Sequence, residues 1–368
     1  MKFFVSKFKL KYINILITIL LYLFLANNII NKNSKKQKYT KRKNIGIIGF
    51  IPSTNLGNNL LKYSMYIILK KLGFKPILIS LKTNINLYFL RKYLNLMEIK
   101  NYSELKEKDF DILIANSDQI WNYKNGKRML EYGFLSFADN WNISKFVYAA
   151  SLGHDYWNPS KEVLNSAKKL VKHLSGISVR EQSSIEIIKK NLGIKPNFVL
   201  DPTFLLDKTD YLTLIKHYKA DIDLKYKYLC VYNLDDSKFL NNYINEVNKE
   251  LKYKILYIKN FGNNYIERFI FSINICRALI TDSFHGTVFS IIFSKPFITF
   301  INIRRGNARF ISLNKTFELY NRIIYPKQFE NNDIILLKTI PKINTTNFHI
   351  LRKQSFDFLK KNLGLIKD

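Results

Sequence analysis

The sequence predicts an α/β protein with two Rossmann-like domains that face each other across a cleft. From Ile45 onward, short apolar runs of strand type alternate with amphipathic runs of helix type. Several strand-like runs are apolar throughout, which is typical of parallel sheets covered by helices on both faces. The chain has 368 residues, more than one hydrophobic core usually supports, so we expect two domains.

An apolar run at residues 12–30, YINILITILLYLFLANNII, predicts an N-terminal hydrophobic helix. A membrane span needs about 20 mostly apolar residues. Residues 1–44 hold eleven Lys or Arg and no Asp or Glu, and seven of these cations directly follow the run. This pattern disfavours a cleaved signal peptide and favours a cytoplasmic body. We therefore predict a membrane-anchor helix and basic linker at 1–44, in the cell membrane, with the body on the cytoplasmic side. A misassigned start codon is the alternative explanation.

The alternating pattern then continues through the body of the chain. Strand-like runs lie at 45–50, 75–81, 111–117, 146–152, 176–179, 198–200, 228–234, 254–259, 278–281 and 297–301. Helix-like runs lie near 58–72, 160–174, 182–192, 237–251, 264–276, 284–294 and 306–320, and a last one at about 346–362. A break near 174–176 divides the pattern into predicted domains at 45–174 and 175–330, followed by a linker and C-terminal helix at 331–368.

The net charge of +31 invites a nucleic-acid interpretation, but the distribution of the charge argues against it. Beyond the N-terminal segment the Lys residues are scattered, and no RNA- or DNA-binding motif accompanies them. Anionic lipids or substrates explain the charge at least as well. We also find no cluster of Asp, Glu, His or Cys with metal-ligand spacing, so no metal site is predicted.

His285 follows a strand-like run in ALITDSFHGTVFSII and falls in the first turn of the next helix. Asp282 or Ser283 can cap this helix, and Gly286 allows a ligand to approach the backbone. Free backbone N–H groups and the helix dipole make such a turn an anion site, to which His285 adds a proton that titrates near neutrality. The alternative is a histidine that only hydrogen-bonds its own turn.

Two arginines extend this anion site. Arg180, in GISVREQSS, lies at the carboxyl end of a strand-like run and offers a planar fork to phosphate or carboxylate. The alternative is a surface arginine paired with Glu181. Arg309, in IRRGNARF, could also reach an anion.

Two further turns combine small polar groups that suit a saccharide. ANSDQIWNY places Ser117, Asp118, Gln119 and Trp121 after an apolar strand, where polar groups could bind hydroxyls and the indole could stack on a sugar ring. An isolated Trp is more often part of a core. STNLGNN supplies Asn55 and Gly57 for a tight turn and a close backbone approach, but it is neither a GxGxxG nor a P-loop motif.

Five motifs occur in an order that resembles the polysaccharide pyruvyl transferase family. They are SDQIWN (117–122), YAAS (148–151), ISVRE (177–181), VLDPT (199–203) and TDSFHG (281–286). The resemblance covers roughly residues 45–362. The loop after the first strand departs from the family, because NNLLKYS follows Gly57.

This resemblance implies a fold similar to that of GT-B glycosyltransferases, with a C-terminal helix that packs back on the N-terminal domain. It implies that phosphoenolpyruvate is the donor substrate, that no cofactor is needed, and that a saccharide or lipid-linked oligosaccharide is the acceptor. The pyruvate would become a ketal in cell-surface polysaccharide biosynthesis. The family's active-site arginine and histidine fall on Arg180 and His285. The alternatives are a GT-B-type nucleotide-sugar glycosyltransferase and a non-catalytic saccharide-binding protein.

The predicted anchor can be tested by deletion. Removing residues 1–30 removes the apolar run, so the truncated protein should move from the membrane fraction to the soluble fraction after ultracentrifugation. A full-length protein that is already in the soluble fraction would contradict the anchor.

Overall fold

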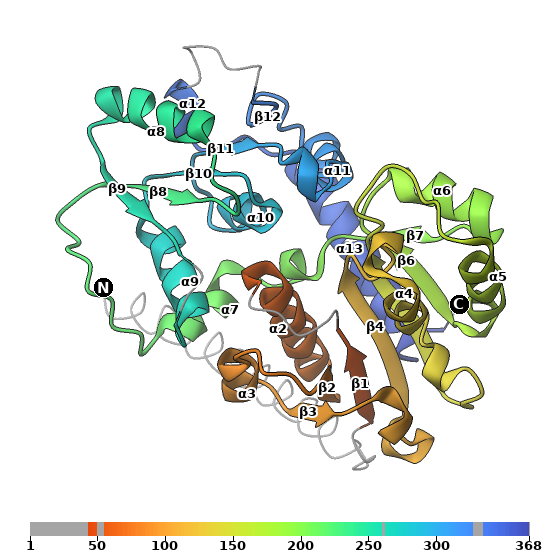
Figure 1. Ribbon diagram of the computed structural model, residues 1–368. Helices are drawn as coiled ribbons and strands as arrows, with labels where there is room; N and C mark the ends of the chain where they lie inside the picture. Colours follow the sequence, from red (N-terminus) through yellow and green to blue (C-terminus); the bar gives the residue numbers. More distant parts are fainter. Residues whose placement is uncertain (1–42, 50–54, 260–261, 327–333, 368) are drawn as a thin grey trace, which may run out of the picture. The chain divides into compact units, whose positions relative to one another are not determined.

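Two parallel β-sheets organise the part of the chain that the computed structural model describes, which comprises residues 43–49, 55–259, 262–326 and 334–367 (Figure 1). The seven-stranded first sheet has the order β3-β2-β1-β4-β5-β6-β7, and the five-stranded second sheet has the order β12-β11-β10-β8-β9. All of the strand pairs within these ranges are parallel. The predicted α/β class with parallel sheets is therefore confirmed.

The strands of the first sheet are β1 (Asn44–Ile48), β2 (Lys75–Leu81), β3 (Leu96–Ile99), β4 (Ile112–Asp118), β5 (Ser144–Ala150), β6 (Gly176–Val179) and β7 (Asn197–Phe198). Those of the second sheet are β8 (Tyr228–Tyr232), β9 (Lys254–Tyr257), β10 (Ala278–Thr281), β11 (Phe297–Phe300) and β12 (Ile323–Ile324). Two short strands at sheet edges, β3 and β12, were not predicted from the sequence.

The α-helices of the first half are α2 (Leu56–Lys71), α3 (Tyr88–Tyr93), α4 (Lys127–Gly133), α5 (Lys161–Leu170) and α6 (Ser183–Leu192). Those that follow are α7 (Lys208–Leu212), α8 (Lys238–Leu251), α9 (Tyr265–Ile275), α10 (Phe284–Ile292), α11 (Ala308–Phe317), α12 (Ile334–Lys338) and α13 (Thr345–Asn362). None of the helices in the described ranges is long and apolar enough to cross a membrane. The hydrophobic helix predicted at 12–30 lies outside the described residues.

The predicted domain boundary at 174–176 lies inside the first sheet. β6 pairs with β5, and β7 pairs with β6, so the first sheet continues to Phe198. The second sheet begins only at Tyr228. Alternation of strand and helix reveals where strands lie along the chain but not which sheet each one joins, which is why the sequence placed the division too early.

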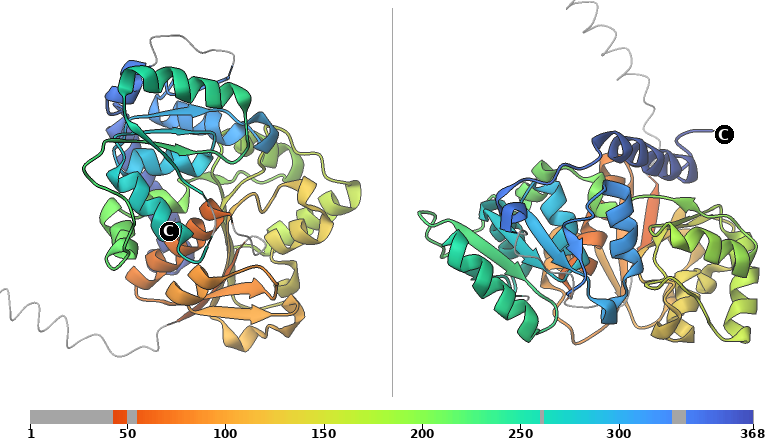
Figure 2. Two further views of the ribbon diagram at one scale, coloured as in Figure 1. Left: turned by 60° about the vertical axis from the view of Figure 1, so that its left-hand side comes forward. Right: turned by 90° about the horizontal axis from the view of Figure 1, so that it is seen from above.

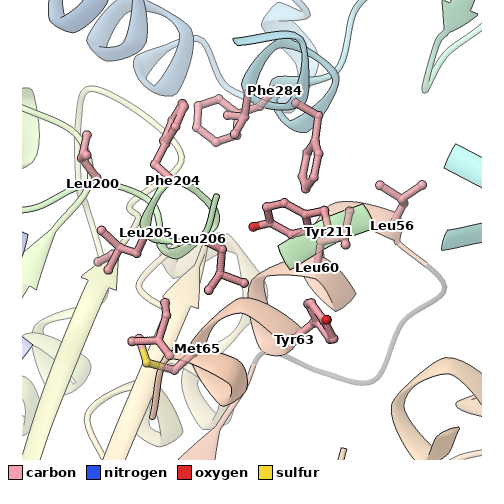
Figure 3. Packing of buried hydrophobic residues seen from close by; sticks show 14 of the residues in the cluster. Leu56, Leu60, Tyr63, Met65, Leu200, Phe204, Leu205, Leu206, Tyr211 and Phe284 are labelled. Atoms are coloured by element: carbon pink, nitrogen blue, oxygen red, sulfur yellow. The ribbon is translucent and has the colours of Figure 1, made fainter. Parts of the chain in front are cut away.

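A continuous apolar cluster joins the two sheets. It contains Ile45 and Ile47 of β1 together with Leu279 of β10, and it also takes in the inward faces of α2, α9, α10 and α13. Figure 3 shows part of it, where Leu60 of α2 and Tyr211 of α7 lie close together, and the cluster also contains Leu56 at the start of α2 and Phe284 at the start of α10. The starts of α2 and α10 are thus held by the same core.

The C-terminal helix α13 packs against the first sheet (Figure 2). The ring of Phe358 lies 6.1 Å, between centroids, from Phe146 and from Tyr148 of β5. Ser355 accepts a hydrogen bond of 2.9 Å from the backbone N–H of Leu200. The last helix therefore binds the segment after β7 through this hydrogen bond. That segment leads from the first sheet toward the second.

Candidate active site

A cavity of about 410 Å³ lies at the carboxyl ends of strands from both sheets. This is where parallel α/β folds bind ligands, and the volume falls in the range of about 300–1,000 Å³ that is usual for small-molecule sites. Seven of the sequence-predicted site residues line it: Asn55, Asp118, Gln119, Asp282, Ser283, His285 and Arg309. The other lining residues are Asn58, Asn122, Lys124, Asn125, His154, Leu234, Phe284, Arg305 and Phe310.

The start of α10 is fixed by short hydrogen-bonding side chains. Ser283 is the N-cap and accepts a 3.3 Å hydrogen bond from the N–H of Gly286. Asp282 accepts a hydrogen bond of 2.7 Å from the backbone N–H of Leu234, which also lines the cavity. Burial raises the pKa of Asp282 in spite of this bond. Gly286 does not face the cavity, because its Cα packs directly on the Thr281 side chain.

Gly57 lets the first turn of α2 approach His285. A Cβ atom on Gly57 would overlap the imidazole ring, so no other residue fits there without displacing it. Asn55 caps α2 and accepts a 3.0 Å hydrogen bond from the N–H of Asn58. The N-termini of α2 and α10 therefore both meet at the cavity, and each carries the positive end of a helix dipole.

His285 is buried and has a free ring nitrogen. It is 6% exposed, and its Nε2 atom has no hydrogen-bond partner within the described structure. The nearest carboxylate oxygen of Asp201 lies 3.9 Å from Nε2, which is too long for a hydrogen bond. Burial, together with the charges of Arg180 and Arg309, outweighs Asp201 and lowers the pKa of His285 to about 4. The imidazole is therefore neutral at pH 7, and its Nε2 is buried without a hydrogen-bond partner among the described residues.

Arg180 is held by carboxylates and is not part of the cavity wall. Its side chain is 2% exposed and donates to Asp201 at 2.7 Å, to Asp118 at 3.1 Å and to Glu181 at 3.4 Å. Burial alone would lower its pKa, but these three carboxylates raise it. Arg180 is thus neither a surface arginine nor a free anion-binding group, and it positions Asp118 and Asp201.

Asp118 lines the cavity at the end of β4. Its backbone has φ 70°, a left-handed conformation that aspartate tolerates and that turns the side chain out of the strand direction. Asn58 donates to its second carboxylate oxygen at 3.0 Å. Burial opposes ionisation, but the charges of Arg180 and Arg309 and the bond from Asn58 hold the pKa of Asp118 below its ordinary value. Asp118 is therefore a carboxylate at neutral pH.

Arg309 is the cation that remains available to a ligand. No carboxylate of the described residues pairs with it within 4.0 Å, its Nε has no hydrogen-bond partner, and one Nη donates to the Arg305 carbonyl at 2.8 Å. Its guanidinium lies 5.5 Å from the centre of the Phe284 ring, and that of Arg180 lies 5.1 Å from it. Burial and the charge of Arg180 lower the pKa of Arg309 to about 10, so it keeps its proton.

Two predicted saccharide contacts are wrong. Trp121 is fully buried, donates its indole N–H to the Gly133 carbonyl at 2.9 Å and stacks on Phe134 at 4.5 Å between centroids, so it belongs to the core. Ser117 is also buried and donates to the Ala149 carbonyl at 3.1 Å. Both follow an apolar strand in sequence, but the chain turns their side chains inward.

Several residues of the site had weak or no signals in the sequence. Asp201 occurs in VLDPT but had no assigned role, and the fold brings one of its oxygens between Arg180 and His285. Lys62 is buried on α2, its Nζ has no hydrogen-bond partner in the described structure, and burial lowers its pKa to about 8. His154 follows β5 and lines the cavity. Among the described residues, no group of three His, Cys, Asp or Glu side chains forms a metal-binding arrangement.

The contact between Gly57 and His285 predicts a strong dependence of one substitution on the other. Gly57→Ala should lower the free energy of unfolding by about 1–3 kcal/mol, because the new methyl group overlaps the imidazole. In a His285→Ala background the ring is gone, so the same change should be neutral or slightly stabilising. Denaturant unfolding of the four proteins measures this coupling. An equal loss in both backgrounds would show that the ring does not fill the space beside Gly57.

The buried imidazole also predicts a pH dependence of stability. The folded pKa of His285 is about 4 and the ordinary value is 6.5, so the unfolded chain binds more protons between these values. Stability should therefore rise from pH 4 to pH 6.5, by about 3 kcal/mol from this group. His285→Gln should lack this part of the pH dependence in urea unfolding measured across that range. If both proteins change equally with pH, His285 is not the buried neutral group.

Comparison with solved structures places the fold in a known class. A protein of Listeria monocytogenes assigned as a UDP-N-acetylglucosamine 2-epimerase matches with a TM-score of 0.54 and 9% identity, over 89% of this chain and 98% of the other. The UDP-GlcNAc 2-epimerase of Methanocaldococcus jannaschii matches with a TM-score of 0.54 and 13% identity, over 85% and 99% of the chains. The glycotransferase of kitacinnamycin matches with a TM-score of 0.52 and 11% identity, over 87% and 96%. At these identities the likeness shows the fold alone, which is GT-B-like.

Sequence comparison identifies the family. No curated protein matches the chain. The sequence profile of polysaccharide pyruvyl transferases matches residues 55–304, which include Asp118, Arg180 and His285. The match covers more than half of the chain, and the five motifs of the sequence analysis all lie within it. The chain therefore belongs to the polysaccharide pyruvyl transferase family, a family of transferases.

Proposed function

We propose that this protein transfers the pyruvyl group of phosphoenolpyruvate to two hydroxyls of a saccharide, forming a ketal and releasing phosphate. The proposal rests on membership of the family and on one feature of the cavity. His285, whose Nε2 has no hydrogen-bond partner, and Arg309, whose guanidinium pairs with no carboxylate of the described residues, both line this cavity. A neutral imidazole and an unpaired arginine at two helix N-termini suit a small, densely charged anion.

Arg309 is the proposed donor clamp. Its planar guanidinium can bind the phosphate or the carboxylate of phosphoenolpyruvate with two parallel hydrogen bonds. Arg180, for which the sequence predicted this role, already donates hydrogen bonds to three carboxylates. In the proposed mechanism Arg180 instead keeps Asp118 ionised and holds Asp118 and Asp201 in place.

His285 is the proposed acid and base. With phosphoenolpyruvate beside it, the imidazole takes up a proton, and Nε2 gives this proton to C3, which becomes the methyl group. Nε2 then takes the proton of the first hydroxyl as the oxygen of that hydroxyl bonds to C2. The C2–O bond to phosphate then breaks, and the second hydroxyl adds to the resulting oxocarbenium-like C2. The proton of the second hydroxyl leaves on the phosphate, so that one phosphate is released for each ketal. Cationic side chains stabilise the departing phosphate, and the proposed reaction needs no cofactor.

The proposed place of action is the cytoplasmic face of the cell membrane. Phosphoenolpyruvate is a cytosolic metabolite, and lipid-linked oligosaccharides are presented at the inner face of the membrane. An apolar segment at 12–30 with cations after it would hold the catalytic body next to such an acceptor.

The reaction predicts phosphate release that depends on both substrates. Full-length protein incubated with phosphoenolpyruvate and a saccharide acceptor should release phosphate and form a ketal. His285→Ala should lower kcat by about 10²–10⁴-fold, because it removes the acid and base. Arg309→Lys should raise the KM for phosphoenolpyruvate by about 10–100-fold, because an ammonium cannot make the bidentate contact.

His349→Ala is the matched control, because His349 is an exposed histidine on α13 and does not line the cavity. Its activity should equal that of the wild type. Release of UDP from a UDP-sugar, without phosphate release from phosphoenolpyruvate, would contradict the proposal and support a nucleotide-sugar glycosyltransferase. Saccharide binding without turnover of either donor would support a non-catalytic binding protein.

A further inference from the structure

An aromatic pair stands at the rim of the cavity on the side of the first sheet. His154 follows β5 and lines the cavity together with Lys124 of the 3₁₀ turn η3 (Tyr123–Asn125). The ring of Tyr156 stacks on His154, with 5.2 Å between centroids and an angle of 27° between the planes. Tyr156 thus lies beside the cavity, against the lining residue His154, although it does not line the cavity itself.

Tyr156 is exposed but held in place from several sides. Lys124 donates to its hydroxyl at 3.1 Å, and the ring of Tyr123 meets it edge-on at 6.3 Å. Tyr156 is nevertheless 48% exposed. His154 stacks on one face of the ring, so the opposite face is the one on which a ligand could stack. A large flat side chain that is fixed and yet uncovered is an available stacking surface.

The neighbouring wall of the cavity carries three side-chain amides. Gln119, Asn122 and Asn125 line it next to Lys124. They are linked to one another. Asn122 donates to the side-chain oxygen of Gln119 at 2.7 Å, and Asn125 donates to the backbone carbonyl of Gln119 at 2.9 Å. An amide has two donor hydrogens and two acceptor lone pairs, so each retains capacity for a ligand. Amides beside an aromatic face are the chemistry that recognises a pyranose, which has hydroxyls around its edge and C–H groups on its face.

We propose that Tyr156, supported by His154 and Lys124, is the platform on which the acceptor's pyranose ring stacks. Gln119, Asn122 and Asn125 bind hydroxyls of that ring. The two hydroxyls that react lie deeper in the cavity, next to His285. This assignment rests on the proposed function for the identity of the acceptor. It gives Tyr156 the stacking role that the sequence analysis assigned to the buried Trp121.

The test compares two substitutions of Tyr156 with a matched control. Tyr257 on β9 is 49% exposed and lies outside the cavity, so Tyr257→Ala removes an equally exposed tyrosine elsewhere. Full-length proteins are mixed with methyl glucopyranoside, galactopyranoside, mannopyranoside and N-acetylglucosaminide, and binding is followed by saturation-transfer NMR. For the pyranoside that wild type binds best, Tyr156→Ala should weaken binding about tenfold. Tyr156→Phe keeps the ring and should stay within about twofold of wild type, as should Tyr257→Ala.

A kinetic measurement separates this inference from the proposed reaction. Tyr156→Ala should raise the KM for the saccharide about tenfold and leave the KM for phosphoenolpyruvate unchanged. If the wild type binds a pyranoside but releases no phosphate from phosphoenolpyruvate, the proposed function is wrong, whereas the role of Tyr156 in saccharide binding is not contradicted. Unchanged pyranoside affinity in Tyr156→Ala, or no binding of any of the four pyranosides by wild type, would overturn the platform.

Discussion

The close contact between Gly57 and the imidazole of His285 is the constraint on which the site depends. It brings the first turns of α2 and α10 together, and only a residue without a Cβ permits it. Burial in this contact removes water from the imidazole and keeps it neutral, with Nε2 unpartnered within the described structure. Because α2 belongs to the first half of the chain and α10 to the second, the same contact fixes the position of one wall of the cavity relative to the other.

Basic and acidic side chains both surround this contact. Three are basic and three are acidic: Lys62, Arg180, Arg309, Asp118, Glu181 and Asp201. A phosphate-bearing ligand adds negative charge beside His285, which raises the pKa of the imidazole and favours uptake of a proton. The arrangement thus links the arrival of an anion to the protonation of the group proposed to move protons.

Much of the fold could be predicted from the sequence, because each buried strand of the parallel sheets is an apolar run with a helix after it. The same pattern did not reveal that β6 joins the first sheet, since pairing is a property of the folded chain. His285, Asp118 and Asn55 could be found because short polar residues at the ends of apolar runs mark the active edge of such sheets. All three line the cavity.

Other features depend on packing that motifs do not record. Arg180 lies at the end of a strand, as expected, but its guanidinium is bonded to three carboxylates. Glu181 is its neighbour in sequence, whereas Asp118 and Asp201 are distant in sequence. Trp121 resembles a sugar-stacking residue until the turn after β4 directs it into the core. Tyr156 has no motif at all, and its place at the rim follows from its stacking on His154. Gly57 was expected to let a ligand approach the backbone, but the imidazole of His285 occupies the space next to its Cα.

The state of His285 with and without ligand is the most direct test of this account. Nitrogen-15 chemical shifts of its imidazole, measured near pH 6.5 in isotopically labelled protein, distinguish the neutral ring from the cation. The account predicts a neutral ring in the free protein and a shift toward the cation when phosphoenolpyruvate is added. A ring that is already cationic in the free protein, or shifts that do not respond to phosphoenolpyruvate, would contradict it.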